Sequence, residues 1–424
     1  MSVELKFLGR FLLLFAALLL AAALVLGLSP GVFALLSLVS RWVELVWFVP
    51  GFALYVLGLC ALGLVQWSRR ASGQPSGPVR LPSAWWLGGG AVLAIALGQA
   101  LLVTGSAPLF WPCFVLAAAL PPLAALSLAT QRLGGVTTWR RALAGLLSGS
   151  LLATQLAVLL GAAVSLLAYA LVLPLRDLVA HVLASTSLEE LFYSPALVFA
   201  LVEVAVVAPL VEELAKPLGA MLLARRLRGP AEAFLVGMAG GVGFAILENM
   251  LYEAAGARIW AGVATLRAVG GVLHPLNAGL VAVGWYGVRH GVPGAWRRLL
   301  GLYGLAVGAH ALWNGGLTVL LSATGTYFFG ADTWRFDIYG LGQPGVVVTF
   351  MLLEALALWR LLVVTTDHLR DPRHAPVETT LALHLERPRR LVLWATGLLA
   401  VLVPAGALYG PLLARYADRL LPVR

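Results

Sequence analysis

Continuous apolar runs, separated by short polar segments, fill most of the sequence. A transmembrane helix needs about 20 consecutive, predominantly apolar residues. Transmembrane β-strands would instead alternate apolar and polar positions, and these runs do not alternate. The pattern therefore predicts an all-α fold, a polytopic transmembrane helical bundle. The predicted spans are roughly residues 11–28, 44–66, 86–105, 109–130, 143–173, 195–224, 232–254, 262–288, 300–322, 345–364 and 391–413, about 11 in all.

Arginines cluster in every second polar segment between these runs. With eleven spans, clusters such as Arg69/Arg70, Arg140/Arg141 and Arg225/Arg226 fall on one side of the membrane, and the opposite loops hold mostly single arginines or acids. Cytoplasmic loops carry the excess of arginine and lysine. The N-terminus is therefore predicted to be cytoplasmic. Three arginines after residue 414 are the one discordant cluster.

The composition agrees with a multi-pass protein of the cell membrane. Hydrophobic residues make up 61% of the 424 residues and charged residues only 11%, against about 25% charged in soluble domains. The net charge of +10 comes from short clusters between apolar runs rather than from a basic domain. We therefore expect the lipid bilayer, and no nucleic acid, as a partner. The sequence carries no signal for an oligomeric state.

Ionisable residues within the apolar runs are concentrated in the middle of the chain. The first five predicted spans contain almost none, whereas the next four contain nearly all. This contrast predicts three parts: residues 1–190, with about five spans and no assigned role; residues 191–325, with about four spans and the chemistry; and residues 326–424, with about two spans.

The span at 195–224 carries Glu212, Glu213 and Lys216 near its midpoint. At about 100° per residue, Lys216 lies about 40° from Glu212 and about 60° from Glu213, so it can face both. The chain contains only two lysines, and Lys216 is the one inside a span. Charged groups at this depth are costly and mark functional sites by default. An ion cluster that only locks helix packing is the structural alternative.

The next three spans also carry polar groups near mid-depth. Consecutive helices usually pack as neighbours, so these groups are predicted to converge on one pocket. A later start of the span at 262–288, near Ala268, would instead leave Arg258 and Arg267 at the membrane interface. The polar groups are Glu248, Asn249 and Tyr252 on 232–254, His274 on 262–288, and His310 and Asn314 on 300–322.

The order and spacing of these residues resemble the PrsW family of bacterial membrane proteases. The matching motifs are Glu212-Glu213-x-x-Lys216, Phe244-x-x-x-Glu248-Asn249-x-x-Tyr252, His274 and His310-x-x-x-Asn314. The family is distantly similar to the CAAX prenyl-protein proteases, which carry an arginine where this chain has Pro217 and a histidine where it has Glu248. The resemblance covers about residues 195–320.

The resemblance implies an intramembrane endopeptidase. Its substrate would be a single-pass, membrane-anchored protein, such as an anti-sigma factor. Peptide hydrolysis needs a base, an electrophile for the oxyanion and a proton donor. We expect either Glu212 or Glu213 to be the base, and the spacing does not distinguish between them. Lys216 would fix the charge of this pair. His310 and Asn314 would bind the oxyanion. Glu248 and His274 would orient the water or move a proton, with Asn249 and Tyr252 in support.

Two alternatives compete with glutamate-activated water. His274, His310 and one or two glutamates would suit zinc, which takes three protein ligands plus water at catalytic sites. The sequence contains no His-Glu-x-x-His motif, so it does not require a metal, and we favour the metal-free version. A proton-coupled carrier would also use buried Glu, Lys and His residues. Inverted repeats would indicate a carrier, and none is evident.

Overall fold

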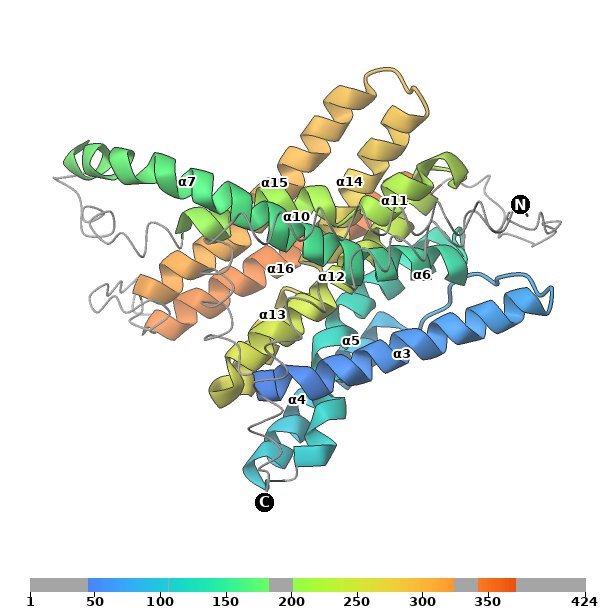
Figure 1. Ribbon diagram of the computed structural model, residues 1–424, viewed down its shortest axis with the longest axis horizontal. Coiled ribbons are helices and arrows are strands. Elements are labelled where there is room, and N and C mark those ends of the chain that lie inside the picture. The colour runs from blue at the N-terminus through green and yellow to red at the C-terminus, as the bar shows by residue number, and fades with distance from the viewer. Residues whose placement is uncertain (1–44, 106, 183–200, 324–341, 371–424) are drawn as a thin grey trace, which may run out of the picture.

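The computed structural model describes residues 45–105, 107–182, 201–323 and 342–370 (Figure 1). Every regular element among them is a helix, and the one β-type pairing is an isolated bridge between Pro78 and Thr138. The all-α prediction is confirmed for this part of the chain. The elements are α3 (Leu45–Ala71), α4 (Ala84–Val103), α5 (Ala107–Leu133), α6 (Trp139–Leu147), η1 (Ser148–Ala153), α7 (Thr154–Val182), η2 (Glu203–Val207), α10 (Ala208–Ala215), α11 (Leu218–Leu223), η3 (Ala224–Arg226), α12 (Pro230–Ala255), η4 (Ala257–Ile259), α13 (Trp260–Val269), α14 (Leu273–Arg289), α15 (Ala295–Ala323) and α16 (Gly342–Leu369).

Six helices within the described ranges are long and apolar enough to cross a membrane, and each coincides with a predicted span. Of the other predicted spans, 44–66 and 300–322 are helical in α3 and α15, whereas 195–224 is divided into short pieces. The spans predicted at 11–28 and 391–413 lie outside the described residues. The total of eleven and the cytoplasmic N-terminus stay predictions. The six helices are Ala84–Val103, Leu109–Leu133, Trp139–Ala168, Pro230–Ala255, Trp260–Arg289 and Gly345–Leu369.

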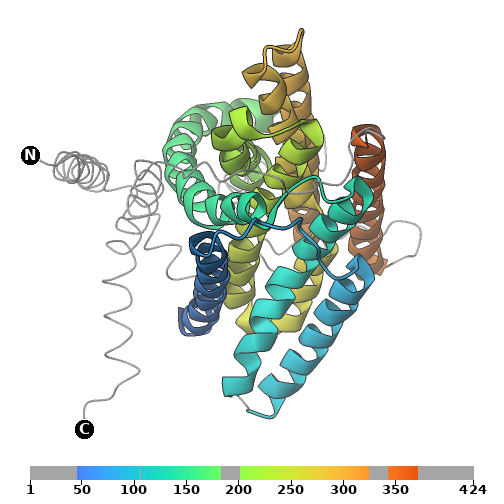
Figure 2. The ribbon, with the colours of Figure 1, turned by 90° about the vertical axis from the view of Figure 1, so that its right-hand side faces the viewer.

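Helix α12 lies at the centre of the bundle (Figure 1) and packs against α5, α6, η1 and α14. Nearly all of its side chains are buried. Around it, α4 and α5 form one hairpin and α14 and α15 another, and these hairpins extend toward opposite ends of the molecule in Figure 2. A helix that is apolar all round belongs in the interior of a large assembly of helices, and α12 occupies that position.

Two glycines of α12 allow its neighbours to approach closely. A Cβ atom built on Gly240 would lie 2.6 Å from the carbonyl oxygen of Lys216. One built on Gly241 would collide with the carbonyl oxygen of His274 and lie 2.7 Å from Cα of Pro275. Helix backbones approach this closely only where small residues stand between them. These glycines thus set the distance from α12 to the backbone of two candidate site residues.

We expect Gly241→Ala to displace the start of α14 and to lower both stability and activity. Overpacking of this kind costs about 1–3 kcal/mol, measurable as a lower thermal unfolding temperature in detergent. Gly304→Ala on α15 is the matched control, because nothing lies within 4 Å of its built Cβ. Unfolding of Gly241→Ala at the temperature of Gly304→Ala would show that α14 does not need this close contact.

Breaks in two helices position the polar residues. Helix α10 has Pro209 in its first turn and ends one residue before Lys216, which Pro217 follows. A π-helical turn, a feature frequent at functional sites, precedes it as η2. The span Trp260–Arg289 is interrupted at Gly270 and Gly271, between α13 and α14. His274 therefore lies in the first turn of a half-helix.

Candidate active site

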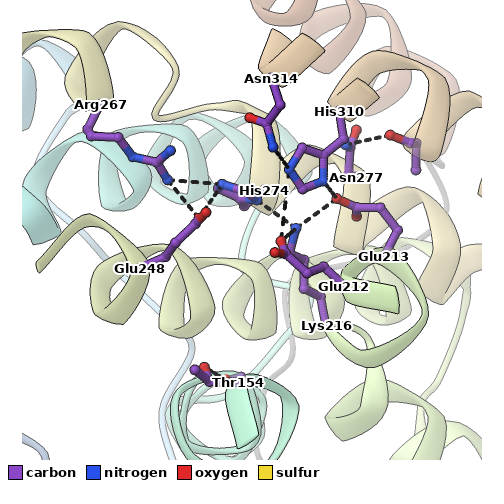
Figure 3. A network of polar contacts seen from close by, with 12 residues as sticks. Thr154, Glu212, Glu213, Lys216, Glu248, Arg267, His274, Asn277, His310 and Asn314 are labelled. Atoms are coloured by element: carbon purple, nitrogen blue, oxygen red, sulfur yellow. Dashed lines mark hydrogen bonds and ion pairs between the residues drawn. The ribbon is translucent and has the colours of Figure 1, made fainter. Parts of the chain in front are cut away.

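Polar side chains from α10, α12, α14 and α15 meet at one place in the helical bundle (Figure 3). Glu213, Lys216 and His310 are fully buried, and His274 is 3% exposed. Glu212 is more accessible, with 15% of its side chain exposed, and so is Glu248 with 12%. The predicted convergence of successive spans is therefore observed for seven residues: Glu212, Glu213 and Lys216 at α10, Glu248 on α12, His274 on α14, and His310 and Asn314 on α15.

Lys216 contacts both carboxylates of its own motif, as its helical spacing predicts. Its Nζ lies 2.7 Å from Oε1 of Glu213 and 3.0 Å from Oε2 of Glu212. Two adjacent buried carboxylates repel one another and are costly to desolvate. The ammonium group between them offsets both costs, so the cluster carries less net negative charge than its two acids alone.

His310 is fixed by a carboxylate on one side and an amide on the other. Its Nδ1 lies 2.7 Å from Oε1 of Glu213, and its Nε2 lies 2.9 Å from Nδ2 of Asn314. An ionised carboxylate only accepts and an amide NH₂ only donates. These partners assign the proton of His310 to Nδ1 and leave the lone pair on Nε2.

His274 is held in the complementary way by a cation and a second carboxylate. Its Nδ1 lies 2.7 Å from Nζ of Lys216, and its Nε2 lies 2.7 Å from Oε2 of Glu248. An ammonium group only donates, so Nδ1 of His274 accepts a hydrogen bond from Lys216. Its Nε2 therefore carries the proton and donates a hydrogen bond to Glu248. Each histidine is therefore paired with its own carboxylate and directs a lone pair elsewhere.

Glu212, His274 and His310 form a possible metal site. Each offers one ligand atom, and the three atoms lie within 4.8 Å of one another. Oε2 of Glu212 is buried and accepts no hydrogen bond, although it lies 3.0 Å from the Lys216 ammonium as an ion pair. Two histidines and one carboxylate are a donor set of catalytic zinc. Because metal-bound histidines usually give their other N–H to a carboxylate or carbonyl, the Glu213–His310 and Glu248–His274 pairs fit a metal as well.

Arg267 is a member of the site that the sequence analysis did not include, and the expectation that it could lie at the membrane interface is wrong. Its side chain is only 7% exposed, and its Nη2 lies 2.7 Å from Oε2 of Glu248. The span continues toward the N-terminus as α13 and brings Arg267 inside. The available signal was an arginine between Leu266 and Ala268 in an apolar run.

Asn249 and Tyr252 contact Arg267. Asn249 accepts a hydrogen bond from Nε of Arg267 at 2.6 Å and donates one to the carbonyl oxygen of Ala118 on α5 at 2.9 Å. The ring centroid of Tyr252 lies 4.7 Å from Cζ of the guanidinium group. Asn249 and Tyr252, which were predicted to support the site, thus hold the side chain of Arg267 from α12.

The fold and the site together define an integral membrane protein with an enzyme-like centre of acids and histidines among its helices. The model of the PrsW-protease family, described as PrsW family intramembrane metalloprotease, matches residues 137–353. This match covers just over half of the 424 residues, and the chain belongs to that family. It is therefore a membrane endopeptidase that acts on membrane proteins within the bilayer. No curated protein and no solved structure matches the chain.

Proposed function

We propose that this endopeptidase is zinc-dependent, that Glu212, His274 and His310 hold the metal, and that its substrate is a single-pass membrane protein. One observation carries the proposal: two buried carboxylate–histidine pairs turn their lone-pair nitrogens toward the side of the site where Oε2 of Glu212 accepts no hydrogen bond and is held by its ion pair with Lys216. The family's description as a metalloprotease supports a metal-dependent reaction. The sequence alone favoured the metal-free version.

Glu213 and Glu248 orient the two histidine rings. Glu213 keeps the proton of His310 on Nδ1, and Glu248 keeps that of His274 on Nε2. When bound, a zinc ion supplies a Lewis acid that polarises the peptide carbonyl and activates water. Without either carboxylate, the histidine on that side is free to rotate or change tautomer.

Lys216 and Asn314 occupy the two lone-pair nitrogens in the structure. Lys216 donates to Nδ1 of His274, and Asn314 donates to Nε2 of His310. Use of these nitrogens as ligands requires both donors to give up the contact. Lys216 keeps Glu212 and Glu213 as partners, and the Asn314 amide becomes available to donate to the oxygen on which negative charge develops during hydrolysis.

The two motif glutamates have different surroundings, and we propose different roles for them. Glu212 is partly exposed and faces the reacting groups, whereas Glu213 is fully buried and orients His310. Oε2 of Glu213 has no hydrogen-bond partner, and we propose that in the zinc version this oxygen accepts the proton of the attacking water. General acid–base transfer of this kind contributes about 10²–10⁴-fold to a rate.

A metal-free hydrolase is the second candidate, and one observation favours it. The Lys216 ammonium already places a positive charge among Glu212, Glu213 and His274. In that version Oε2 of Glu212 takes the proton of the attacking water directly. Both versions place Glu212 at the reacting centre, as a ligand in the zinc version and as the base in the metal-free version, and they differ in whether activity requires a metal.

The three-part division of the chain also remains a proposal. The family match extends beyond residues 191–325 at both ends and includes α6, η1, α7 and the beginning of α16. Helix α6 and η1 pack directly against α12. We propose that residues 191–325 supply the chemistry and that α6 and η1 hold α12 in place.

Peptide cleavage in vesicles tests the proposed function. The purified full chain is reconstituted with synthetic peptides that each carry one transmembrane helix of about 20 apolar residues, and products are identified by mass spectrometry. We expect cleavage within the apolar segment, its loss after treatment with a chelator, and its return with zinc. Full cleavage after verified removal of metal would overturn the zinc version and leave the Glu212 hydrolase. Proton-driven solute uptake without any cleavage would overturn both.

A further inference from the structure

Arg267 contacts three residues of α12 and lies against His274 of α14. Its Nη2 lies 2.7 Å from Oε2 of Glu248 and its Nε lies 2.6 Å from Oδ1 of Asn249, while the ring of Tyr252 covers the guanidinium group. The same Nη2 lies 3.2 Å from Nε2 of His274. One side chain thus links α13 to residues of both α12 and α14, as Figure 3 shows for Glu248 and His274.

The contact between Arg267 and His274 shows how the arginine acts. Arginine only donates, and Nε2 of His274 carries a proton because Nδ1 accepts from Lys216. The two donors therefore do not bond to each other. Both converge on Oε2 of Glu248, at 2.7 Å each. Arg267 fixes this oxygen and its charge, and the oxygen in turn fixes the ring of His274.

Arginine is better suited to this task than lysine. A guanidinium group presents several donors in a planar fork and stays charged when buried. Here separate nitrogens of the fork hold Glu248 and Asn249, and its face lies 4.7 Å from the centre of the Tyr252 ring. A single ammonium group could pair with Glu248 but could not hold Asn249 and stack on Tyr252 in this geometry.

We propose that Arg267 is a positioning residue of the endopeptidase. It holds Glu248 in place, and through Glu248 it keeps Nδ1 of His274 directed at the Glu212–Lys216 side of the site. It does not touch the reacting atoms. The inference rests on the proposed active site, and it goes beyond that site by adding a residue outside the family-like motifs and naming the path through which it acts.

The Arg141–Glu232 pair supplies a matched control. It also joins a neighbouring helix, α6, to a buried glutamate of α12, with 2.5 Å between Nη1 and Oε1. Glu232 also accepts a hydrogen bond at Oε2 from the backbone N–H of Arg228. Arg141→Gln and Arg267→Gln therefore each remove an ion pair to a glutamate of α12, and only Arg267→Gln should loosen His274.

The experiment compares these variants by cleavage of the single-span peptides, thermal unfolding and the ¹⁵N spectrum of His274. We expect Arg267→Gln to lower kcat about 10–100-fold, the usual effect of losing a group that orients a ligand, with KM unchanged. The ¹⁵N signals of His274 should change from a single Nε2-protonated tautomer to a mixture. Arg141→Gln should unfold at a lower temperature but keep the wild-type kcat and His274 spectrum.

A double variant tests whether the path runs through Glu248. Residues that act as one unit show non-additive effects, so Arg267→Gln combined with Glu248→Gln should be no slower than Glu248→Gln alone. Losses that multiply would overturn the proposal, and so would a wild-type kcat in Arg267→Gln. If Arg267→Gln fails to fold, Arg267→Lys replaces it, because lysine keeps the charge beside Glu248. A lowered kcat in Arg267→Lys with a mixture of His274 tautomers supports the proposal, and a lowered kcat with the single wild-type tautomer contradicts it, because the loss would then not run through His274.

The result for Glu212→Gln separates this inference from the proposed site. An inactive Glu212→Gln together with a folded and fully active Arg267→Gln would refute the role of Arg267 and leave the site intact. A fully active Glu212→Gln would refute the site itself, whatever Arg267 does.

Discussion

Glu212→Gln should abolish peptide cleavage while leaving the protein folded. The amide keeps the size of the side chain but loses the charge that either holds a metal or takes a proton from water. The loss expected from general acid–base catalysis alone is about 10²–10⁴-fold in kcat. Folding should survive, because Lys216 keeps Glu213 and His274 as partners when it loses its ion pair with Glu212, and a neutral amide is less costly to bury than a carboxylate.

The matched control for this variant is Glu354→Gln on α16. Glu354 is also a buried acid in an apolar span, and neither of its carboxylate oxygens has a hydrogen-bond partner. The variant should cleave the single-span peptides at the wild-type rate. Equal losses in both variants would indicate a general effect of replacing buried acids and would count against a special role for Glu212.

His310→Ala should inactivate the enzyme as completely as Glu212→Gln and should also remove bound zinc. The substitution deletes the Nε2 lone pair and leaves the buried Oε1 of Glu213 with Lys216 as its remaining partner. Because residues that act as a unit are not additive, the double variant should be no slower than either single variant. Rates come from peptide cleavage, and zinc content from elemental analysis of the purified protein.

His290→Ala controls for the loss of a histidine. His290 is exposed at the C-terminal end of α14 and contacts the carbonyl oxygen of Tyr286, outside the site. We expect wild-type zinc content and activity in this variant. Zinc that persists in His310→Ala would exclude His310 as a ligand.

Much of this site could be predicted because helix geometry is local. The positions of Lys216 relative to Glu212 and Glu213 follow from 3.6 residues per turn, and so does the pairing of His310 with Asn314. Their convergence followed from the tendency of successive helices to pack together. The motif order then indicated the family.

The remaining features depend on distances between helices, which one sequence does not contain. Arg267 is 19 positions from Glu248 along the chain, and the turn at Gly256 and η4, between α12 and α13, brings their helices together. The different surroundings of Glu212 and Glu213 depend on His310, which bonds to Glu213 from 97 positions away along the chain. A metal site with ligands on α10, α14 and α15 has no local spacing like His-Glu-x-x-His, so the sequence alone gave no reason to prefer zinc.

The metal environment of the active enzyme tests the central claim most directly. X-ray absorption at the zinc edge, recorded on purified protein whose peptide cleavage has been measured, reports the kind and number of ligands. The account predicts a bound zinc ion with nitrogen and oxygen ligands at about 2.0–2.2 Å, including two imidazoles, and no sulfur. Full activity in a sample without stoichiometric metal, or a zinc ion ligated by Cys60 or Cys113, would contradict it.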